Sequence, residues 1–298
     1  MKTIDVARSH SITSNSGVSV AGRLWALGLL LIICVSGNVA AVPNHTKPQR
    51  IVSLSLCTDQ ILLMLADPEN IAAVSNFAAD PSYSYMWKEA QNIHFHAGLA
   101  EQIIPLQPDL IIGPEFNIGQ TVAMLEALGL HVQRFNTPTT LKAVSAYIRE
   151  IGQAIGERER AQELIVQLER ELMAADNLVA QTPRQLAVSY APNGFTAGNK
   201  TLKGEILNRA GYDNVADDLG IEDYGNISVE QLLYAQPDLV IIDDGTGNKN
   251  SLAQSFTQHP ALRGYLAAKN TLTIPSNYWL CPGPASIYAL TLLAQGRQ

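Results

Sequence analysis

The chain has 298 residues, of which 47% are hydrophobic and 16% are charged. These proportions are typical of a globular protein long enough for about two domains, and they exclude a disordered chain. The formal net charge of -7 argues against nucleic acid as a partner, because no basic stripe is present to neutralise phosphates.

The amino terminus has the features of a secretory signal peptide. Basic residues precede an apolar run from Leu24 to Val35, which is shorter than the roughly 20 residues needed to span a membrane. Val39-Ala40-Ala41 supplies the small residues expected before a cleavage site. We therefore predict a signal peptide over residues 1–41, export of the mature protein, and no stable membrane insertion.

The mature chain begins with an α/β pattern. Arg50 to Leu56 predicts a buried strand, followed by a helix for which Thr58 or Asp59 supplies the amino-terminal cap. Ile71 to Ser75 predicts a second strand. The segment from Asn76 to Ala97 has little periodicity and is rich in aromatic and histidine residues, which is typical of a functional loop.

One stretch of the sequence occurs twice, at residues 101–112 and 230–241. Both copies start with Glu-Gln and continue to Gln-Pro-Asp-Leu at the same spacing. The pattern predicts a short helix, a stop at the proline with an extended glutamine before it, and a strand buried on both faces. Short patterns also recur by chance, but the shared register favours duplication and therefore two similar α/β lobes.

Two helical patterns lie between the repeat copies, at Leu141 to Ile155 and Glu157 to Ala180. In the second, apolar residues recur at three- and four-residue steps along one face. An ordinary surface helix has the same pattern, but the position between the copies favours a helix that joins two lobes. We predict an amino-terminal lobe over residues 50–155, an interlobe helix over 157–180 and a carboxyl-terminal lobe over 185–298.

The second lobe is predicted to open with a strand from Gln185 to Tyr190 and a helix from Leu202 to Ala210. Ser228 precedes Gln231 at the spacing of a capping box, which marks the start of the helix in the second repeat copy. Thr271 to Ile274 predicts the last strand, before a loop and a terminal helix.

No catalytic or metal-binding motif is found in the sequence. A Gly-x-Ser-x-Gly elbow, a His-Glu-x-x-His zinc motif and a phosphate-binding loop are all missing. Gly245 and Gly247 follow a strand but lack the third glycine of a dinucleotide fingerprint. His94 and His96 alternate on an extended segment, which points them to opposite sides and disfavours joint metal ligation. We predict no enzyme activity, no cofactor and no metal site.

Aromatic residues gather on loops that follow predicted strands. Ligands bind at the carboxyl ends of strands in open α/β sheets, so two facing lobes would line one cleft with these side chains. Any one of them can instead pack in the core or at the rim, and the grouping is what suggests a large, partly apolar ligand. The residues are Phe77, Phe116, Phe195, Tyr224, Tyr278 and Trp279.

Two cysteines remain once the signal peptide is removed, Cys57 and Cys281. We predict that both lie on loops at the cleft, one from each lobe. An exported protein can pair them in a disulfide that holds the lobes together. Reduced, they can offer thiolate ligands to a metal centre, and a third possibility is that both are unpaired and buried.

Several motifs follow one another in a fixed order through the mature chain. They are Arg50-Ile51-Val52-Ser53-Leu54, the Pro-Asp-Leu strand starts at Pro108 and Pro237, Phe195-Thr196-Ala197-Gly198, and Ser276 to Trp279. With these motifs the chain resembles periplasmic substrate-binding proteins of ABC importers for vitamin B12 and iron chelates. The resemblance implies two Rossmann-like lobes joined by one rigid helix, a ligand cleft between them, and limited closure on binding.

The resemblance also implies roles for particular residues. Glu101 and Glu230, one on each lobe, map to glutamates that dock onto basic residues of the membrane permease. Tyr224 and Trp279 stand where proteins similar to the cobalamin binders place an aromatic residue. Tyr278 takes the place of an acidic residue, and His96 stands near a position often filled by tryptophan, so we include His96 among the ligand-binding residues.

Three hypotheses for function follow. The first is a monomeric periplasmic receptor that captures a corrinoid, haem or ferric chelate and delivers it to an ABC permease. The few basic residues in the proposed loops, chiefly Lys88 and Lys200, disfavour highly anionic catecholate chelates. The second is a tetrapyrrole- or metal-handling enzyme of chelatase-like two-lobed fold. The third is a surface adhesin or scaffold that binds another protein.

Overall fold

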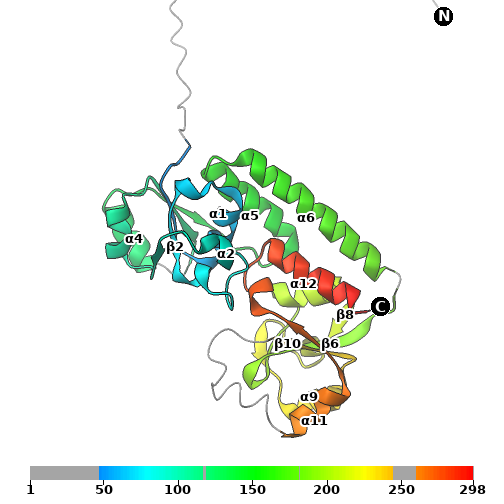
Figure 1. Ribbon diagram of the computed structural model, residues 1–298. Coiled ribbons are helices and arrows are strands. Elements are labelled where there is room, and N and C mark those ends of the chain that lie inside the picture. Colours follow the sequence, from blue (N-terminus) through cyan, green and yellow to red (C-terminus); the bar gives the residue numbers. More distant parts are fainter. Residues whose placement is uncertain (1–46, 117–118, 181, 244–259, 298) are drawn as a thin grey trace, which may run out of the picture. The chain divides into compact units, whose positions relative to one another are not determined.

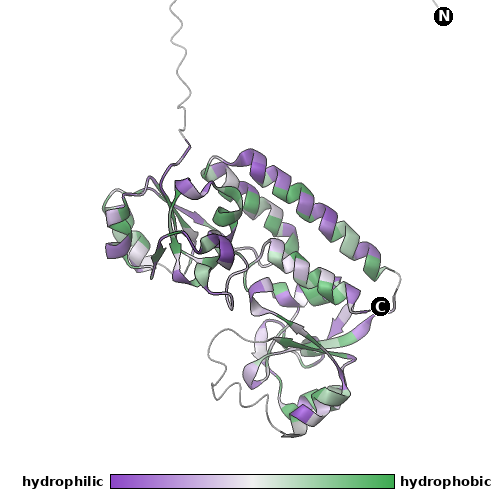
Figure 2. Ribbon diagram, viewed as in Figure 1, coloured by the Kyte–Doolittle hydropathy of each residue, from purple (hydrophilic) through white to green (hydrophobic). Residues whose placement is uncertain are grey.

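The computed structural model describes residues 47–116, 119–180, 182–243 and 260–297 (Figure 1). They belong to one compact unit that begins at His45. The predicted signal peptide and the glycine pair Gly245 and Gly247 lie outside the described residues. Along the long helix α6 (Arg158–Val179), hydrophilic and hydrophobic residues alternate (Figure 2).

The amino-terminal lobe contains a parallel sheet with the strand order β3-β2-β1-β4-β5. Its strands are β1 (Ile51–Ser53), β2 (Ile71–Ser75), β3 (Phe95–His96), β4 (Leu110–Pro114) and β5 (Val132–Phe135). Its helices are α1 (Leu56–Leu65), α2 (Trp87–Ala90), α3 (Ala100–Ile103), α4 (Gly119–Ala127) and α5 (Leu141–Ala154). Neighbouring residues of β1, Ile51 and Val52, belong to core clusters on opposite faces, which explains why this strand is apolar throughout.

The carboxyl-terminal lobe has a second parallel sheet with the order β11-β10-β6-β8. Beside it, β7 and β9 form an antiparallel ribbon. The strands are β6 (Gln185–Tyr190), β7 (Phe195–Ala197), β8 (Tyr212–Asn214), β9 (Tyr224–Asn226), β10 (Leu239–Asp243) and β11 (Asn270–Ile274). The helices are α7 (Leu202–Arg209), α8 (Val215–Asp218), α9 (Val229–Ala235), α11 (Pro260–Ala268) and α12 (Pro284–Gln295).

The repeated stretch takes equivalent positions in the two lobes, as α3 with β4 and α9 with β10. The glutamine before each proline is not extended as predicted. Gln107 and Gln236 are both left-handed, each with φ of 48°. This conformation also avoids the αR region that the proline disfavours, and it turns the chain sharply from helix to strand.

The aspartate of each Pro-Asp pair has a structural role. The Asp109 carboxylate accepts hydrogen bonds from the Gln49 and Arg50 amides at 2.7 and 3.0 Å, and Asp238 accepts one from the Leu186 amide at 2.8 Å. Each aspartate therefore ties the start of its own strand to the neighbouring strand, β1 or β6. This requirement explains why the aspartate occurs in both copies.

The two lobes are joined by α6 (Arg158–Val179), as the sequence predicted. Two further helices contribute to the packing between the lobes. Helices α5 and α12 both pack against α6. Leu141 of α5 belongs to a core cluster of the carboxyl-terminal lobe, and Ile287 of α12 belongs to one of the amino-terminal lobe. Each of these two helices therefore packs a side chain into the core of the other lobe. The periodicity of a helix in the sequence does not reveal such long-range contacts.

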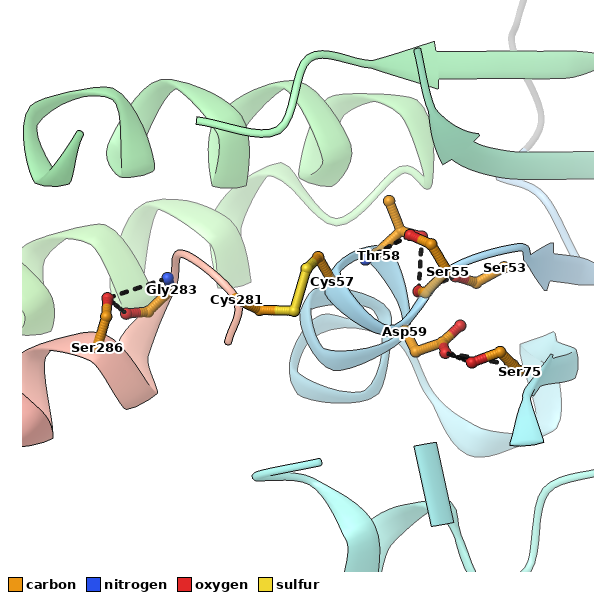
Figure 3. Close-up of a disulfide and its surroundings, with 9 residues drawn as sticks. All are labelled: Ser53, Ser55, Cys57, Thr58, Asp59, Ser75, Cys281, Gly283 and Ser286. Atoms are coloured by element: carbon orange, nitrogen blue, oxygen red, sulfur yellow. Dashed lines mark hydrogen bonds between the residues drawn. A yellow bond between two sulfur atoms is a disulfide. The ribbon is translucent and has the colours of Figure 1, made fainter. Parts of the chain in front are cut away.

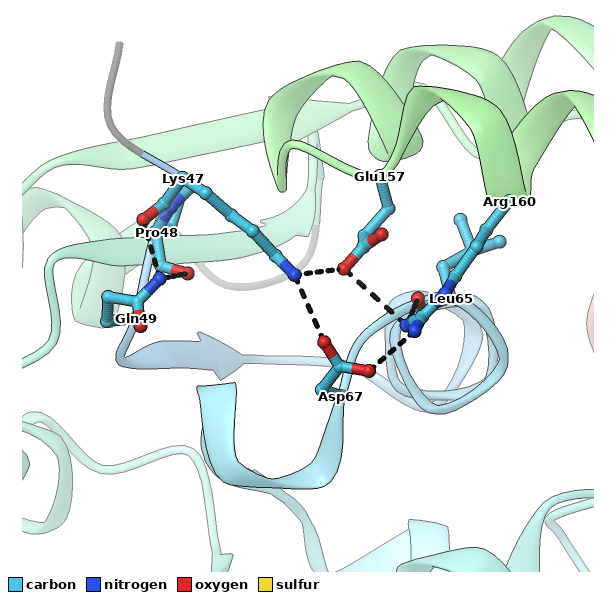
Figure 4. Close-up of polar contacts among 7 residues, drawn as sticks. All are labelled: Lys47, Pro48, Gln49, Leu65, Asp67, Glu157 and Arg160. Atoms are coloured by element: carbon cyan, nitrogen blue, oxygen red, sulfur yellow. Dashed lines mark hydrogen bonds and ion pairs between the residues drawn. The ribbon is translucent and has the colours of Figure 1, made fainter.

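A network of four charges fixes the beginning of α6 (Figure 4). Lys47 lies 3.2 Å from Asp67 and 2.5 Å from Glu157, while Arg160 lies 2.6 Å from Asp67. The Arg160 guanidinium also donates to the carbonyl of Leu65, the last residue of α1. The network ties together the chain before β1, the end of α1 and the first turn of α6.

Two local predictions in the amino-terminal lobe were wrong. Ser55, not Thr58 or Asp59, caps α1, because its hydroxyl accepts from the Thr58 amide. The segment from Asn76 to Ala97 is not one long loop, since it contains a short 3-10 turn, α2 and β3. Elements of two to four residues carry too little periodicity to be recognised in the sequence.

Candidate functional site

A pocket of about 620 Å³ opens in the amino-terminal lobe. It lies where β1 and β2 end, next to the residues that follow β3 and the first turn of α4. This is the edge at which ligands bind in open parallel sheets, and the volume lies within the range of small-molecule sites. The lining residues are Leu54, Ser55, Leu56, Ser75, Asn76, Phe77, Ala97, Gly98, Gly119, Gln120 and Thr121.

Among the described residues of the lining, the polar side chains carry hydroxyl or amide groups and none is charged. Of the predicted ligand-binding aromatics, Phe77 is present, with 53% of its surface exposed. The serine, asparagine, glutamine and threonine residues of the wall were missed by sequence reasoning. Each is common on any surface, so no sequence signal distinguishes them.

Ser55, a lining residue of the pocket, belongs to a network of hydroxyl groups (Figure 3). Its hydroxyl lies 2.9 Å from that of Thr58, and the buried Ser53 hydroxyl donates to Thr58 at 2.8 Å. The Thr58 hydroxyl is also 3.0 Å from the Ser55 carbonyl, to which it can donate. The network fixes the turn from β1 into α1 and so sets the position of the Ser55 side chain in the wall.

Ser75, which lines the pocket at the end of β2, is held by the buried carboxylate of Asp59. The Ser75 hydroxyl and amide donate to the same oxygen, Asp59 Oδ2, at 2.5 and 3.2 Å. The other oxygen, Oδ1, has no hydrogen-bond partner among the described residues. Burial raises the pKa of Asp59 to about 7, and the nearby Ser53 hydroxyl and the hydrogen bonds from Ser75 only partly oppose this effect.

Replacing Asp59 with asparagine is expected to flatten the pH dependence of stability. The folded state raises the pKa of Asp59 to about 7, so it favours the protonated carboxyl. The resulting stabilisation of the folded protein is complete below the ordinary aspartate pKa near 4 and is lost as the pH rises through 7. The full loss is on the order of 4 kcal/mol. Asparagine does not ionise, so urea unfolding at about pH 5 and pH 8 is expected to differ less in Asp59→Asn than in the wild type. An unchanged difference would contradict this prediction.

Two of the predicted ligand-binding residues are buried, each only 2% exposed. His96 forms hydrogen bonds with Ser53 and Gly98 through its two ring nitrogens. Trp279 belongs to a core cluster of the carboxyl-terminal lobe, with the Lys203 ammonium 4.7 Å from its ring centroid. Packing and hydrogen bonds therefore enclose both side chains, which the sequence did not indicate.

The other predicted aromatics retain exposed surface. Phe195 and Tyr224 face each other across the β7–β9 ribbon as a stacked pair, with ring centroids 5.6 Å apart and an interplanar angle of 9°. They are 39% and 59% exposed, and Phe116 is 71% exposed. Tyr278 lies 5.7 Å from the ring of Tyr85, so it contacts the amino-terminal lobe.

Cys57 and Cys281 form a disulfide (Figure 3). It links α1 of the amino-terminal lobe to the loop before α12, across a sequence separation of 224 residues. The sequence left three alternatives open: a disulfide, two thiolate ligands, or two unpaired buried cysteines. The structure has the disulfide. Cys57 lies in the first turn of α1 and not on a loop, since the helix already begins at Leu56.

Glu101 and Glu230 take the same place in their helices. Each is the second residue, of α3 and of α9, and each side chain is exposed. The glutamine that follows folds back onto the chain before the helix in both lobes. Gln102 accepts from the Ala97 amide at 2.7 Å, and Gln231 accepts from the Ser228 amide at 2.9 Å. The repeated Glu-Gln thus combines an exposed carboxylate with a glutamine that accepts a hydrogen bond from the chain at or before the helix start, which in α9 completes a capping box.

The described residues offer neither a metal-binding cluster nor a membrane-spanning helix. No group of three or more histidine, cysteine, aspartate or glutamate side chains in them is arranged to hold a metal ion. None of their helices is both long and apolar enough to cross a membrane.

Proteins of known type resemble this chain over most of its length. A cobalamin-binding protein of Halobacterium salinarum is 23% identical over 265 residues, covering 85% of this chain and 70% of that protein. An uncharacterised ABC transporter substrate-binding lipoprotein of Bacillus subtilis is 23% identical over 212 residues, covering 68% of this chain and 66% of that protein.

A solved structure agrees with the fold. The periplasmic heme-binding protein of Roseiflexus sp. RS-1, in its apo form, aligns with a TM-score of 0.68 and 27% identity, covering 83% of this chain and 97% of that one. The model of the periplasmic binding protein family matches residues 51–274, which include both sheets and the helix that joins them. The chain belongs to the periplasmic binding protein family.

Proposed function

We propose that the protein is an exported, monomeric receptor that captures a bulky, uncharged corrinoid and delivers it to an ABC import permease. The observation that carries the choice of ligand is the amide- and hydroxyl-lined pocket, whose described lining residues include no charged side chain. The named relatives are binding proteins, which supports a receptor over a chelatase-like enzyme or an adhesin.

The pocket chemistry supports a corrinoid over the other two ligand classes. Haem carries carboxylates and ferric catecholates are anionic, and burying such a charge without a partner is costly. The buried Asp59 carboxyl below Ser75 adds to this cost whenever it is ionised. A corrinoid carries neutral amides, which can both donate to and accept from the Ser, Asn, Gln and Thr side chains of the wall.

The aromatic side chains supply the apolar part of the proposed site. The stacked pair of Phe195 and Tyr224 belongs to the carboxyl-terminal lobe, whereas Phe77 and Phe116 belong to the amino-terminal lobe. All four are exposed and available to a flat macrocycle held between the lobes. Aromatic surface of this kind contributes both buried area and stacking. Tyr278 remains a proposed contact at the junction of the lobes.

The permease is proposed as the partner because a relative is named as a substrate-binding lipoprotein of an ABC transporter. Glu101 and Glu230 are the proposed docking residues. They present one exposed carboxylate at the equivalent position of each lobe. A pair of positive charges on a two-fold permease would complement both at once.

Ligand titration of the mature protein tests the proposal. We expect cyanocobalamin to quench tryptophan fluorescence with a Kd below about 10 μM, and hemin and a ferric catecholate to bind at least about tenfold more weakly. Tight binding of hemin in preference to cyanocobalamin would contradict the choice of ligand. If none of the three binds, the receptor function itself is wrong.

The double variant Phe195→Ala/Tyr224→Ala is expected to weaken corrinoid binding by about 10- to 100-fold, because it removes two aromatic contacts. Tyr234 provides the matched control, since it is 91% exposed on α9, away from the β7–β9 ribbon. Tyr234→Ala is expected to bind as the wild type does. Equal affinities of the double variant and the wild type, measured in the same titration, would exclude the aromatic pair from the site.

A further inference from the structure

The buried His96 side chain has both ring nitrogens occupied. Nε2 lies 2.8 Å from the carbonyl oxygen of Ser53, and the Gly98 amide donates to Nδ1 at 2.9 Å. A carbonyl oxygen can only accept a hydrogen bond and a backbone amide can only donate one. His96 must therefore carry its proton on Nε2 and leave Nδ1 free to accept. The geometry requires a neutral imidazole.

The hydrogen bond to Nδ1 fixes a residue of the pocket wall. Gly98 lines the pocket and has a φ of +81°, in the left-handed region that favours glycine. Its carbonyl accepts from the Thr121 hydroxyl at 2.9 Å, and Thr121 lines the pocket from the first turn of α4. Gly98 thus connects the wall after β3 to the wall at α4, and His96 holds it from below.

We propose that His96 is a positioning residue for the ligand pocket, and that its protonation releases the Ala97–Gly98 wall and weakens ligand binding. A proton on Nδ1 would face the Gly98 amide hydrogen, so two donors would oppose each other where one bond existed. The wall would lose its support from His96 while the Thr121 contact remained. This inference rests on the proposed function, because it assigns the pocket to the ligand.

The surroundings of His96 determine at which pH the release occurs. Burial lowers the pKa of His96 below its usual range; the hydrogen bond with Ser53 opposes this and the nearby His94 adds to it. Ser75 pairs with His96 in the sheet and donates a hydrogen bond to the Asp59 carboxyl of α1. Tyr147 of α5 is near Asp59. Asp59 also titrates in this region, with a pKa of about 7, so its effect must be separated from that of His96.

Four proteins separate these effects when cyanocobalamin affinity is measured from about pH 7.5 to pH 5. We expect wild-type affinity to fall by about tenfold, the size of one lost hydrogen bond. His94 is exposed, so His94→Gln serves as the matched control and keeps the fall. His96→Asn places an oxygen near the Nδ1 position without a titrating group, and it is expected to lose most of the fall. Asp59→Asn is expected to keep the part that depends on His96.

A constant wild-type affinity over this range would overturn the proposal. So would a fall of equal size in His96→Asn and the wild type. A fall that disappears in Asp59→Asn but persists in His96→Asn would assign the effect to Asp59 and overturn the role of His96.

Nitrogen NMR of the ligand-free protein tests the same inference without ligand binding. We expect the His96 ring to be protonated at Nε2 alone near neutral pH. On acidification, the amide signals of Gly98 and Thr121 are expected to shift with the same midpoint as the His96 ring. A ring protonated at Nδ1, or a Gly98 amide signal that does not follow His96, would overturn the proposal. Because no ligand is used, failure of corrinoid binding would leave this result interpretable.

Discussion

Removing the disulfide between Cys57 and Cys281 is expected to lower the free energy of unfolding by about 5 kcal/mol. The bond closes a loop with a sequence separation of 224 residues, so it removes much conformational entropy from the unfolded chain. It also ties α1 of one lobe to the loop before α12 of the other. Urea unfolding of Cys57→Ser/Cys281→Ser, compared with the oxidised wild type, measures the effect.

Reductant separates the bond from the substitutions. Reduced wild-type protein is expected to unfold near the midpoint of the double serine variant, and the variant itself is expected to be insensitive to reductant. Thiol counting on denatured protein is expected to give no free thiol from Cys57 or Cys281 before reduction. A double variant as stable as the oxidised wild type would show that the other contacts between the lobes suffice.

Replacing both Glu101 and Glu230 with arginine is expected to abolish docking onto the permease and uptake of ligand. The position near a helix start favours either carboxylate by only about 0.3–1 kcal/mol, whereas close charge pairs across an interface couple by about 1.5–7 kcal/mol. The double reversal turns two proposed attractions into repulsions. Ligand affinity and unfolding are expected to stay near their wild-type values, because both side chains are exposed.

Glu163 and Glu169 provide a control for net charge. Both are exposed on α6, so Glu163→Arg/Glu169→Arg makes the same change in charge elsewhere on the surface. Binding to permease in nanodiscs and ligand uptake by cells are expected to fail in the Glu101/Glu230 variant and to persist in the control. Wild-type transport by the Glu101/Glu230 variant would exclude docking through these residues. A parallel loss of ligand affinity would place them in the ligand site.

The architecture was largely contained in the sequence because it depends on local patterns. Apolar runs without alternation predicted central parallel strands, and the repeated Glu-Gln and Pro-Asp-Leu motifs predicted two related lobes. The structure confirms the two lobes and the connecting helix. The repeat has a physical basis in each lobe, since Asp109 and Asp238 bind the chain at the start of the neighbouring strand. The same aspartate contact occurs in both lobes, so the repeated motif indicates a repeated structure.

Some local geometry was wrongly predicted even where the element was right. The sequence placed an extended glutamine before each proline, but Gln107 and Gln236 are left-handed. Proline disfavours only the αR region for the preceding residue and leaves more than one alternative. The tight connection from helix to strand selected between them. Similarly, three polar residues near the start of α1 could cap it, and the path of the chain after β1 selected Ser55.

The site depended on tertiary structure, because its walls come from four segments that are far apart in the sequence. Ser55, Ser75, Gly98 and Gln120 belong to no motif, and they meet only because parallel strands end at one edge of the sheet. Burial was equally hidden. The sequence suggested His96 and Trp279 as ligand contacts but did not indicate that packing and hydrogen bonding enclose both. The type of a residue determines which interactions its side chain can make. Only the fold determines which partners surround that side chain.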